Sequence, residues 1–202
     1  MSKIKAITIE DNEAFLRQIS KPVEKGDAEL PDNIAILEKY CKQHERILAM
    51  AAVQLGIPKR LIYIKNTNID LITKPISNKT KEEKLYNEAR ILINPVIISK
   101  EGLTEDWESC ASCLDNLGLV KRPYRIKVEF CDLDGQKKTE IFEGFESTVL
   151  SHEIDHLDGI LHMDIADEVL QIPKNERKEF WKTHNGYTII SKTGTFEELL
   201  KK

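Results

Sequence analysis

The sequence predicts an α+β fold, with strands in the middle of the chain and helices at each end. Three observations predict it. A segment with helical periodicity begins near residue 31, two alternating segments flank Asp134-Gly135, and a second helical segment covers residues 146–158.

Length and composition describe an ordinary globular protein of one domain, or of one domain plus an appendage. The chain has 202 residues, 41% of them hydrophobic and 32% charged. Its 30 basic and 34 acidic residues argue against a nucleic-acid binder, and no apolar run is long enough to cross a bilayer. The first residues lack the features of a secretory signal, so we expect a cytoplasmic protein with reduced thiols. The four cysteines are then expected to be free thiols or metal ligands: Cys41, Cys110, Cys113 and Cys131.

The N-terminal part predicts a helix and a strand. Pro31, Asp32 and Asn33 suit a helix start, and apolar residues follow at three- and four-residue steps up to Leu48. We expect this element to end in the segment from Gln54 to Pro58. The run "KRLIYIK" (59–65) predicts a strand, and the polar residues 66–88 predict a long loop.

The middle of the chain predicts strands followed by a helix. The run "ARILINPVIIS" (89–99) predicts a strand in which Pro95 marks an edge or a bulge. Alternation on both sides of Asp134-Gly135 predicts a hairpin. A helix is expected from Glu146 to Asp158, stopped by Gly159. After residue 165 we expect a charged tail with two short helices, the last beginning at Thr195 with Glu198 at capping-box spacing. Residues 167–202 would then be a C-terminal helical extension of the catalytic domain formed by residues 1–166.

The expected helix at 146–158 carries the spacing of a metal site. His152 and His156 are four residues apart, so both rings lie on one face and can direct a nitrogen at one ion. Glu153 follows the first histidine and flanks that position, where a general base belongs. Asp155, next to His156, is placed either to support the metal-binding residues without binding the ion itself or to form a salt bridge on the helix surface. The segment therefore predicts a metal-dependent hydrolase.

The residues leave three candidates for the remaining ligand. His162 completes the pattern H-E-x-x-H-x-x-G-x-x-H of a protease class, although no methionine turn follows it. Cys110 would give a Cys-plus-two-His set with one open position, as catalytic zinc sites have. Cys110 and Cys113 together would close a Cys2His2 tetrahedron, which is a structural site without activity.

Three stretches resemble the peptide deformylase family. "ESCAS" (108–112) is similar to its E-G-C-L-S motif, "HEIDHLDG" (152–159) to its H-E-x-D-H-L-x-G motif, and "AMAAVQ" (49–54) to the end of its G-x-G-L-A-A-x-Q motif. The likeness covers roughly residues 12 to 166. It implies a deformylase-like fold, with antiparallel or mixed sheets packed around the central histidine-bearing helix, an N-terminal helix and a C-terminal helical extension.

The resemblance also implies a site and a reaction. Cys110, His152 and His156 would hold one divalent ion, Fe²⁺ in the first place and Zn²⁺, Ni²⁺ or Co²⁺ otherwise. Glu153 would move the protons while water removes the formyl group of an N-formylmethionyl peptide. The developing oxyanion would be stabilised by the side chain of Gln54 and the backbone N–H of Ala111. A transient contact with the ribosome is implied, and binding to nucleic acid or membrane is not expected.

Further residues are carried over by the same resemblance. Glu108 would pair with Arg122, and the methionine pocket would be lined by Ala49, Phe145 and Val149. The chain departs from the family pattern at Ile47, Ala49, Met50, Ser109 and Ala111. Ile47 and Ala49 replace glycines, which predicts altered substrate preference or activity. If the chemistry were lost, the chain would be a deformylase-like protein without the activity.

Overall fold

The computed structural model describes residues 4–44, 46–65, 89–184 and 186–201 of the chain. The loop predicted at 66–88 lies outside the described residues. The helices are α1 (Ile9–Leu16), α2 (Leu30–Gln43), α5 (Phe145–Leu157), α6 (Arg177–Thr183) and α7 (Phe196–Leu199), with short 3-10 turns at Ala52–Leu55 and His162–Asp164. The strands are β1 (Ala49–Ala51), β2 (Leu61–Ile64), β3 (Arg90–Cys110), β4 (Cys113–Arg122), β5 (Arg125–Cys131), β6 (Lys137–Glu143), β7 (Glu168–Gln171) and β8 (Thr188–Thr195).

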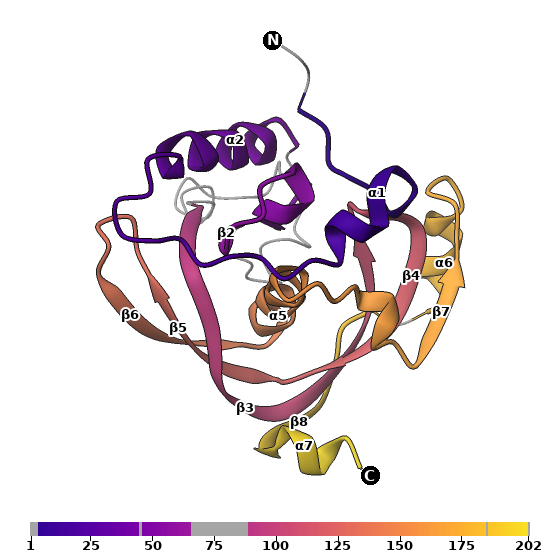
Figure 1. Cartoon of the computed structure of the whole chain (residues 1–202). Helices are drawn as coiled ribbons and strands as arrows, with labels where there is room; N and C mark the ends of the chain where they lie inside the picture. The colour runs from indigo at the N-terminus through magenta and orange to yellow at the C-terminus, as the bar shows by residue number, and fades with distance from the viewer. Residues whose placement is uncertain (1–3, 45, 66–88, 185, 202) are drawn as a thin grey trace, which may run out of the picture.

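The long strand β3 organises the sheet. Its first half pairs with β2 on one side and β5 on the other, and its second half pairs with β4 and β8. In the part of the chain that the structure describes, all strand pairs are antiparallel, and one isolated parallel bridge joins Lys21 to Lys59. The strands curve around α5, which lies in the middle of the molecule (Figure 1). This arrangement confirms the α+β prediction.

Helix α5 packs into the hollow of the sheet through an apolar face. Leu150, Ile154 and Leu157 belong to one buried cluster with side chains from β1, β2, β3, β5 and β6. Because these side chains recur at three- and four-residue steps, they fall on one side of the helix. The opposite side is left to the histidines.

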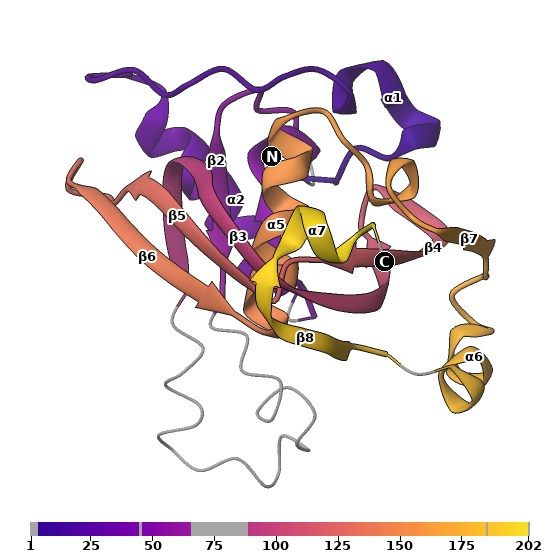
Figure 2. The ribbon, with the colours of Figure 1, turned by 90° about the horizontal axis from the view of Figure 1, so that it is seen from below.

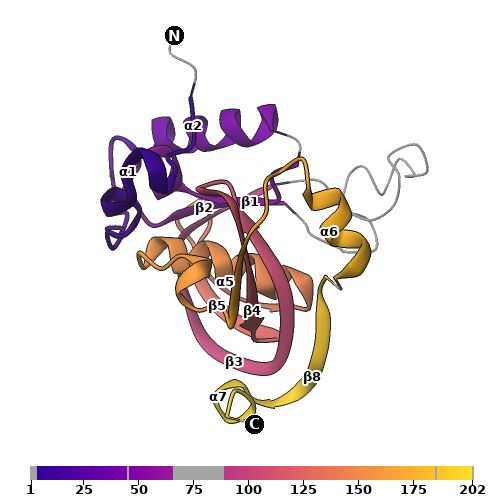
Figure 3. The ribbon, with the colours of Figure 1, turned by 90° about the vertical axis from the view of Figure 1, so that its right-hand side faces the viewer.

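Helix α2 covers the other face of β2 and the first part of β3. Side chains alternate along β2, so that Ile62 packs toward α5, whereas Leu61 and Tyr63 pack toward Leu37 and Cys41 of α2. Figure 3 shows the two helices on opposite sides of these strands. The sheet between them is therefore buried on both faces.

The predicted first helix ends earlier than expected. It begins at Leu30, with a proline in its first turn as predicted, but it ends at Gln43 and not near Gln54. Residues 49–51 instead form β1, which pairs with β2, and all three side chains are buried. The apolar spacing continued to Leu48, but pairing with a buried strand outweighed the local helical pattern. Helix α1, at Ile9–Leu16, was not predicted.

The other central elements follow the prediction closely. Pro95 lies within β3 where the pairing with β5 shifts register between Ile93 and Val96, so it marks a bulge. The preceding Asn94 has a positive φ of 53°, and its side chain exchanges two hydrogen bonds with the backbone of Val23. The β5–β6 hairpin turns at Asp134-Gly135 as expected.

The chain after residue 165 contains two strands besides the two predicted short helices. Strand β7 pairs with β4, and β8 pairs with β3. The predicted C-terminal helices are present, and the two strands, which the sequence did not predict, add to the main sheet (Figure 2). Thr195 is the residue before α7 as predicted, but its side chain makes no capping hydrogen bond. The domain division at 166/167 stays a prediction, and the shared sheet supports placing the tail in the same domain.

Both ends of α5 are anchored. Near its start, Ser147 donates a hydrogen bond to the Pro123 carbonyl at 2.8 Å. At its end, Gly159 has a φ of +75°, and a Cβ there would lie 2.3 Å from the carbonyl oxygen of Arg17. Only glycine permits this close approach in this backbone conformation. Among the described residues, none of the helices has the length and apolar character needed to cross a membrane.

Candidate active site

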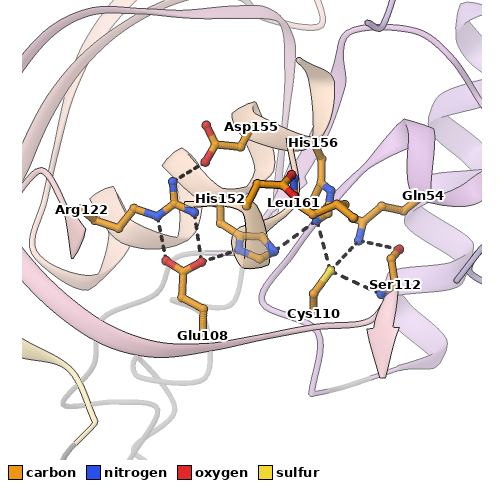
Figure 4. Close-up of polar contacts among 10 residues, drawn as sticks. Gln54, Glu108, Cys110, Ser112, Arg122, His152, Asp155, His156 and Leu161 are labelled. Carbon is orange, nitrogen blue, oxygen red and sulfur yellow. Dashed lines mark hydrogen bonds and ion pairs between the residues drawn. The ribbon is translucent and has the colours of Figure 1, made fainter. Parts of the chain in front are cut away.

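The two histidines of α5 face the second half of β3. The Nε2 atoms of His152 and His156 lie 3.2 Å apart, one helical turn from each other. Cys110, the last residue of β3, brings its sulfur to 3.1 Å from Nε2 of His156. The three ligand atoms lie within 4.8 Å of one another, and the three residues point toward one another in Figure 4. The structure thus brings together the three residues expected to bind metal.

The spacing of these donors fits a single divalent ion. Metal–nitrogen bonds of about 2.0–2.1 Å and metal–sulfur bonds of about 2.3 Å place tetrahedral nitrogen ligands about 3.3 Å apart, and a sulfur and a nitrogen about 3.6 Å apart. The observed nitrogen–nitrogen separation of 3.2 Å is close to this value, and the sulfur–nitrogen separation of 3.1 Å is about half an ångström shorter. One thiolate and two imidazoles also form a donor set that suits zinc or ferrous iron. With three protein donors, a fourth position is left for water or substrate.

A buried carboxylate orients His152. Glu108 Oε2 lies 2.7 Å from Nδ1 of His152, so Nδ1–H donates to the carboxylate and Nε2 is left free to bind metal. Glu108 is held in turn by Arg122, through Nε–Oε1 at 2.7 Å and Nη2–Oε2 at 3.0 Å. Arg122 also pairs with Asp155 of α5. The predicted Glu108–Arg122 pair is therefore confirmed, and it is a buried part of the site.

The charges of this cluster support one another. Burial opposes ionisation of Glu108, but the adjacent Arg122 outweighs burial and lowers the pKa of the carboxyl far below its usual value. A hydrogen bond from Cys113 and the nearby histidines lower the pKa of Cys110 well below that of a free thiol. Burial would lower the pKa of His152, but its contacts with Cys110 and Glu108 raise that pKa instead. A thiolate next to a proton-binding imidazole is an arrangement in which a metal cation can replace the proton.

Gln54 directs its amide nitrogen at the sulfur. The backbone N–H of Ala51 donates to Oε1 of Gln54 at 3.1 Å, which assigns the orientation of the amide. Nε2 then lies 3.3 Å from the sulfur of Cys110 and 3.1 Å from the hydroxyl of Ser112. Gln54 is 2% exposed, so its donor reaches the site without competition from bulk water. This is a suitable position for a donor to a developing oxyanion.

Glu153 is buried beside the histidines with one free oxygen. The residue is 6% exposed, and its Oε2 has no hydrogen-bond partner within the described part of the chain. Burial raises the pKa of this carboxyl, and the adjacent histidines counteract the rise. A partly desolvated carboxylate with a free lone pair suits a general base.

A cavity of about 690 Å³ opens onto these residues. Its lining includes Gln54, Cys110, Ala111, His152 and Glu153, so the expected catalytic and metal-binding residues share one space, except for the buried His156. The residues expected at the methionine pocket also line it: Ala49, Phe145 and Val149. The space is therefore large enough for a short peptide to reach the metal ligands.

The other two candidate ligands lie apart from the helix pair. His162 forms a group with Cys110 and Cys113, within 4.8 Å, and not with the two histidines of α5. Its ring centroid is 5.7 Å from that of His152. Cys113 belongs to the same second group, so the closed Cys2His2 site finds no support.

Comparison with known proteins agrees with this geometry. The family model described as polypeptide deformylase matches residues 4–171. A peptide deformylase of Pelagibacter ubique is 35% identical over 170 residues, which cover 82% of this chain and 88% of the relative.

This chain belongs to the polypeptide deformylase family.

Solved structures of deformylases share the fold. A probable peptide deformylase from Synechococcus phage S-SSM7 superposes with a TM-score of 0.64 at 32% identity, covering 80% of this chain and 99% of that one. A class I type b peptide deformylase from Acinetobacter baumannii, crystallised with Met-Ala-Ser bound, gives 0.65 at 25% identity, covering 81% and 99%. The chain is thus a metallohydrolase of the deformylase family, and the protease and structural-zinc alternatives are not favoured.

Sequence reasoning missed some residues that the structure adds to this deformylase site. Ser112 receives a hydrogen bond from Gln54, and its backbone N–H lies 3.3 Å from the sulfur of Cys110. Asp155 could not be assigned from sequence, and the structure joins it to Arg122. Its position three residues after His152, one turn along the same helix face, was the available signal.

Proposed function

We propose that the chain removes the formyl group from N-formylmethionyl peptides, with Cys110, His152 and His156 holding one divalent ion. Fe²⁺ is the proposed native ion, and Zn²⁺, Ni²⁺ or Co²⁺ would also suit one thiolate and two imidazoles. The observation that carries the proposal is the convergence of these three donors from β3 and α5 beside a buried, partly unpaired Glu153. When bound, the ion would polarise the formyl carbonyl and make a coordinated water more acidic.

Glu153 moves the protons of the reaction. Its free Oε2 takes a proton from the attacking water as that water adds to the formyl carbon. The same carboxyl then gives the proton to the departing amine, so that the products are formate and a free α-amino group. Because burial raises its pKa, the carboxyl holds the proton between the two steps more readily than an exposed glutamate would.

Gln54 and Ala111 stabilise the charge that develops on the formyl oxygen. The Gln54 amide is fixed by Ala51, so its N–H groups already face the site before substrate arrives. Ala111 lies in the turn after β3 and lines the cavity, and its backbone N–H is the proposed second donor. Donors that are already in place favour the transition state because they need no reorganisation.

The substrate is proposed to enter as a short extended peptide. Ala49, Phe145 and Val149 line the apolar part of the cavity and would receive the methionine side chain. The Met-Ala-Ser peptide bound by the Acinetobacter baumannii relative supports a short peptide beginning with methionine as the ligand. Formylmethionine begins nascent chains, so we place the activity in the cytoplasm, with transient contact to the ribosome.

A formate assay on protein of known metal content tests the proposal. Anaerobically prepared, Fe²⁺-loaded protein is incubated with formyl-Met-Ala-Ser, and formate and free amine are measured together. We expect equal amounts of both products. Glu153→Gln should keep its ion and lose at least about 10²-fold in turnover, because both proton transfers depend on this carboxyl. A fully metallated wild-type sample that releases no formate would refute the function.

A further inference from the structure

A second cluster of metal-binding side chains lies against the sulfur of Cys110. Cys113 is the strand partner of Cys110 across the β3–β4 turn, and His162 lies in the 3-10 turn that follows α5. One ligand atom from each of the three residues lies within 4.8 Å of the others. Cys113 is 0% and His162 1% exposed, so both are shielded from solvent.

His162 is buried without a partner. Neither ring nitrogen has a hydrogen bond within the described residues. The ring is held in place by β4, since a Cβ on Gly118 would lie 2.9 Å from its Cδ2 atom. Buried polar groups are nearly always hydrogen-bonded or bound to a ligand. An imidazole that is fixed, buried and unpaired beside two sulfurs therefore points to a missing ligand.

We propose that Cys113, His162 and the shared sulfur of Cys110 form a second site, for a thiophilic divalent ion such as Zn²⁺. Two sulfurs and one imidazole are a soft donor set, which favours zinc over harder ions. Binding releases the thiol proton of Cys113 to solvent. The site is inhibitory, because the sulfur of Cys110 then divides its electron density between two ions. The inhibition, unlike the binding of the second ion, rests on the proposed function, in which Cys110 binds the catalytic ion.

Counting ions tests the second site without reference to catalysis. The wild type, Cys113→Ser and His162→Phe are each loaded with one and then with excess Zn²⁺ under a phosphine reductant, and bound zinc is measured after gel filtration. We expect two ions per wild-type chain and one per chain of either variant. Cys131→Ser is the matched control, because this half-buried thiol lies elsewhere in the sheet and should leave two ions.

Activity gives the second readout. Each protein is compared with its own one-ion form, and excess Zn²⁺ should lower formate release about tenfold in the wild type but not in the Cys113 or His162 variants. One ion per wild-type chain at every zinc ratio, or two ions in Cys113→Ser, would overturn the site. If no form releases formate, the proposed function fails while the ion count still decides this proposal.

A separate observation concerns the mouth of the cavity. Lys174, Arg177, Lys178 and Trp181 line one wall of it, and they come from α6 and the residues just before it. This segment lies beyond residues 4–171, which match the family. Arg177 is fixed by hydrogen bonds to the carbonyl oxygens of Leu114 and Ile172. The wall is therefore ordered and lies outside the residues that match the family model, and α6 stands at the flank of the molecule in Figure 3.

The charges on this wall are not neutralised locally. Within the described ranges, Lys174, Arg177 and Lys178 take part in no ion pair with a carboxylate. Arg46 lines the same cavity and adds a fourth cation. The carboxylates that line the same cavity belong to Asp106, Glu108 and Glu153, whereas this wall contributes cations only. A wall with one sign of charge attracts ligands of the opposite sign and raises their association rate. Trp181, 41% exposed, offers an apolar surface beside these cations.

We infer that the wall selects formyl peptides with acidic residues after the methionine. The test compares formyl-Met-Ala-Glu-Glu-amide with formyl-Met-Ala-Gln-Gln-amide at low ionic strength. We expect kcat/KM to be about tenfold higher for the acidic peptide, mainly through KM, and the difference to shrink as salt is added. Turnover of the neutral peptide reports the deformylase reaction itself, so failure of the function is recognised separately.

Charge reversal on α6 identifies the wall as the cause. The double variant Lys174→Glu/Lys178→Glu should abolish the preference, because Arg46 and Arg177 then balance the two new carboxylates, whereas Lys182→Glu should keep it. Lys182 lies on the same helix but pairs with Glu179 and does not line the cavity. Equal kcat/KM for the two peptides in the wild type, or an unchanged ratio in the double variant, would overturn the inference.

Discussion

Replacing Glu108 by glutamine should weaken both metal binding and folding. Glu108 is 7% exposed and joins the guanidinium of Arg122, 4% exposed, to Nδ1 of His152. The amide keeps the shape of the side chain but removes its charge. Arg122 is then left with Asp155 as its only anionic partner among the described residues. His152 loses the carboxylate that holds its ring in the metal-binding orientation.

The magnitudes follow from burial and from the partners that remain. Removing one partner of a buried ion pair costs about 3–5 kcal/mol, and because Asp155 stays we expect about 3 kcal/mol. This corresponds to roughly a hundredfold change in the folding equilibrium. Loss of the carboxylate that accepts a hydrogen bond from a metal-binding histidine typically lowers metal affinity by about 10- to 100-fold. The two effects should appear together.

Two assays separate the two effects. Urea unfolding in the presence of a chelator gives the stability of the metal-free protein, and competition with a chromophoric chelator gives metal affinity. Glu101→Gln is the matched control, because its pair with Arg125 has side chains that are 39% and 37% exposed, and it should change stability by less than about 1 kcal/mol. If Glu108→Gln behaves like Glu101→Gln in both assays, the buried pair does not support the site.

Three further predictions concern single residues. Gln54→Leu should lower kcat by about 10²–10³-fold at unchanged metal content, because one donor to the oxyanion is lost. Stopped assays give kcat and metal analysis gives the ion content, and an unchanged kcat would exclude Gln54 as an oxyanion donor. Burial and a neighbouring carboxylate raise the pKa of Asp106 from 3.8 to about 7, so the folded state binds the extra proton and stability should fall between about pH 4 and 7. Asp106→Asn should flatten this slope in urea unfolding at several pH values, and an unchanged slope would contradict the assignment. Gly159→Ala should destabilise the protein far more than Gly135→Ala. Both glycines have a positive φ, but only at Gly159 would the new Cβ lie against backbone, 2.3 Å from the carbonyl oxygen of Arg17. Equal melting temperatures of the two variants would contradict the close approach of Gly159 to Arg17.

The helix of the site could be predicted because its signal is local. His152, Glu153 and His156 lie within one and a half turns, so their mutual placement follows from helix geometry alone. Gly159 marks its end for an equally local reason. The third metal ligand could not be predicted from local geometry. Residue chemistry left Cys110 and His162 open, and only the resemblance selected Cys110, because strand pairing between distant segments brings it to the helix.

The missed elements depended on tertiary contacts. Residues 49–51 favour helices by their intrinsic propensity, but they pair with β2 inside the core. This pairing outweighed their helix propensity. Strand β8 is mostly exposed and shows no alternation of buried and exposed residues, which removes the usual sign of a strand. The proximity of His162 to Cys113 could not be read from sequence either, because it arises where the turn after α5 meets the β3–β4 hairpin.

X-ray absorption at the metal edge of protein loaded with a single equivalent of ion identifies the atoms that bind it. We expect one sulfur at about 2.3 Å and two imidazole nitrogens at about 2.0–2.1 Å, with an oxygen donor in the remaining position. The sulfur should disappear in Cys110→Ser and persist in Cys131→Ser. An ion bound without sulfur in the wild type, or bound by four side chains, would rule out an open site formed by Cys110, His152 and His156.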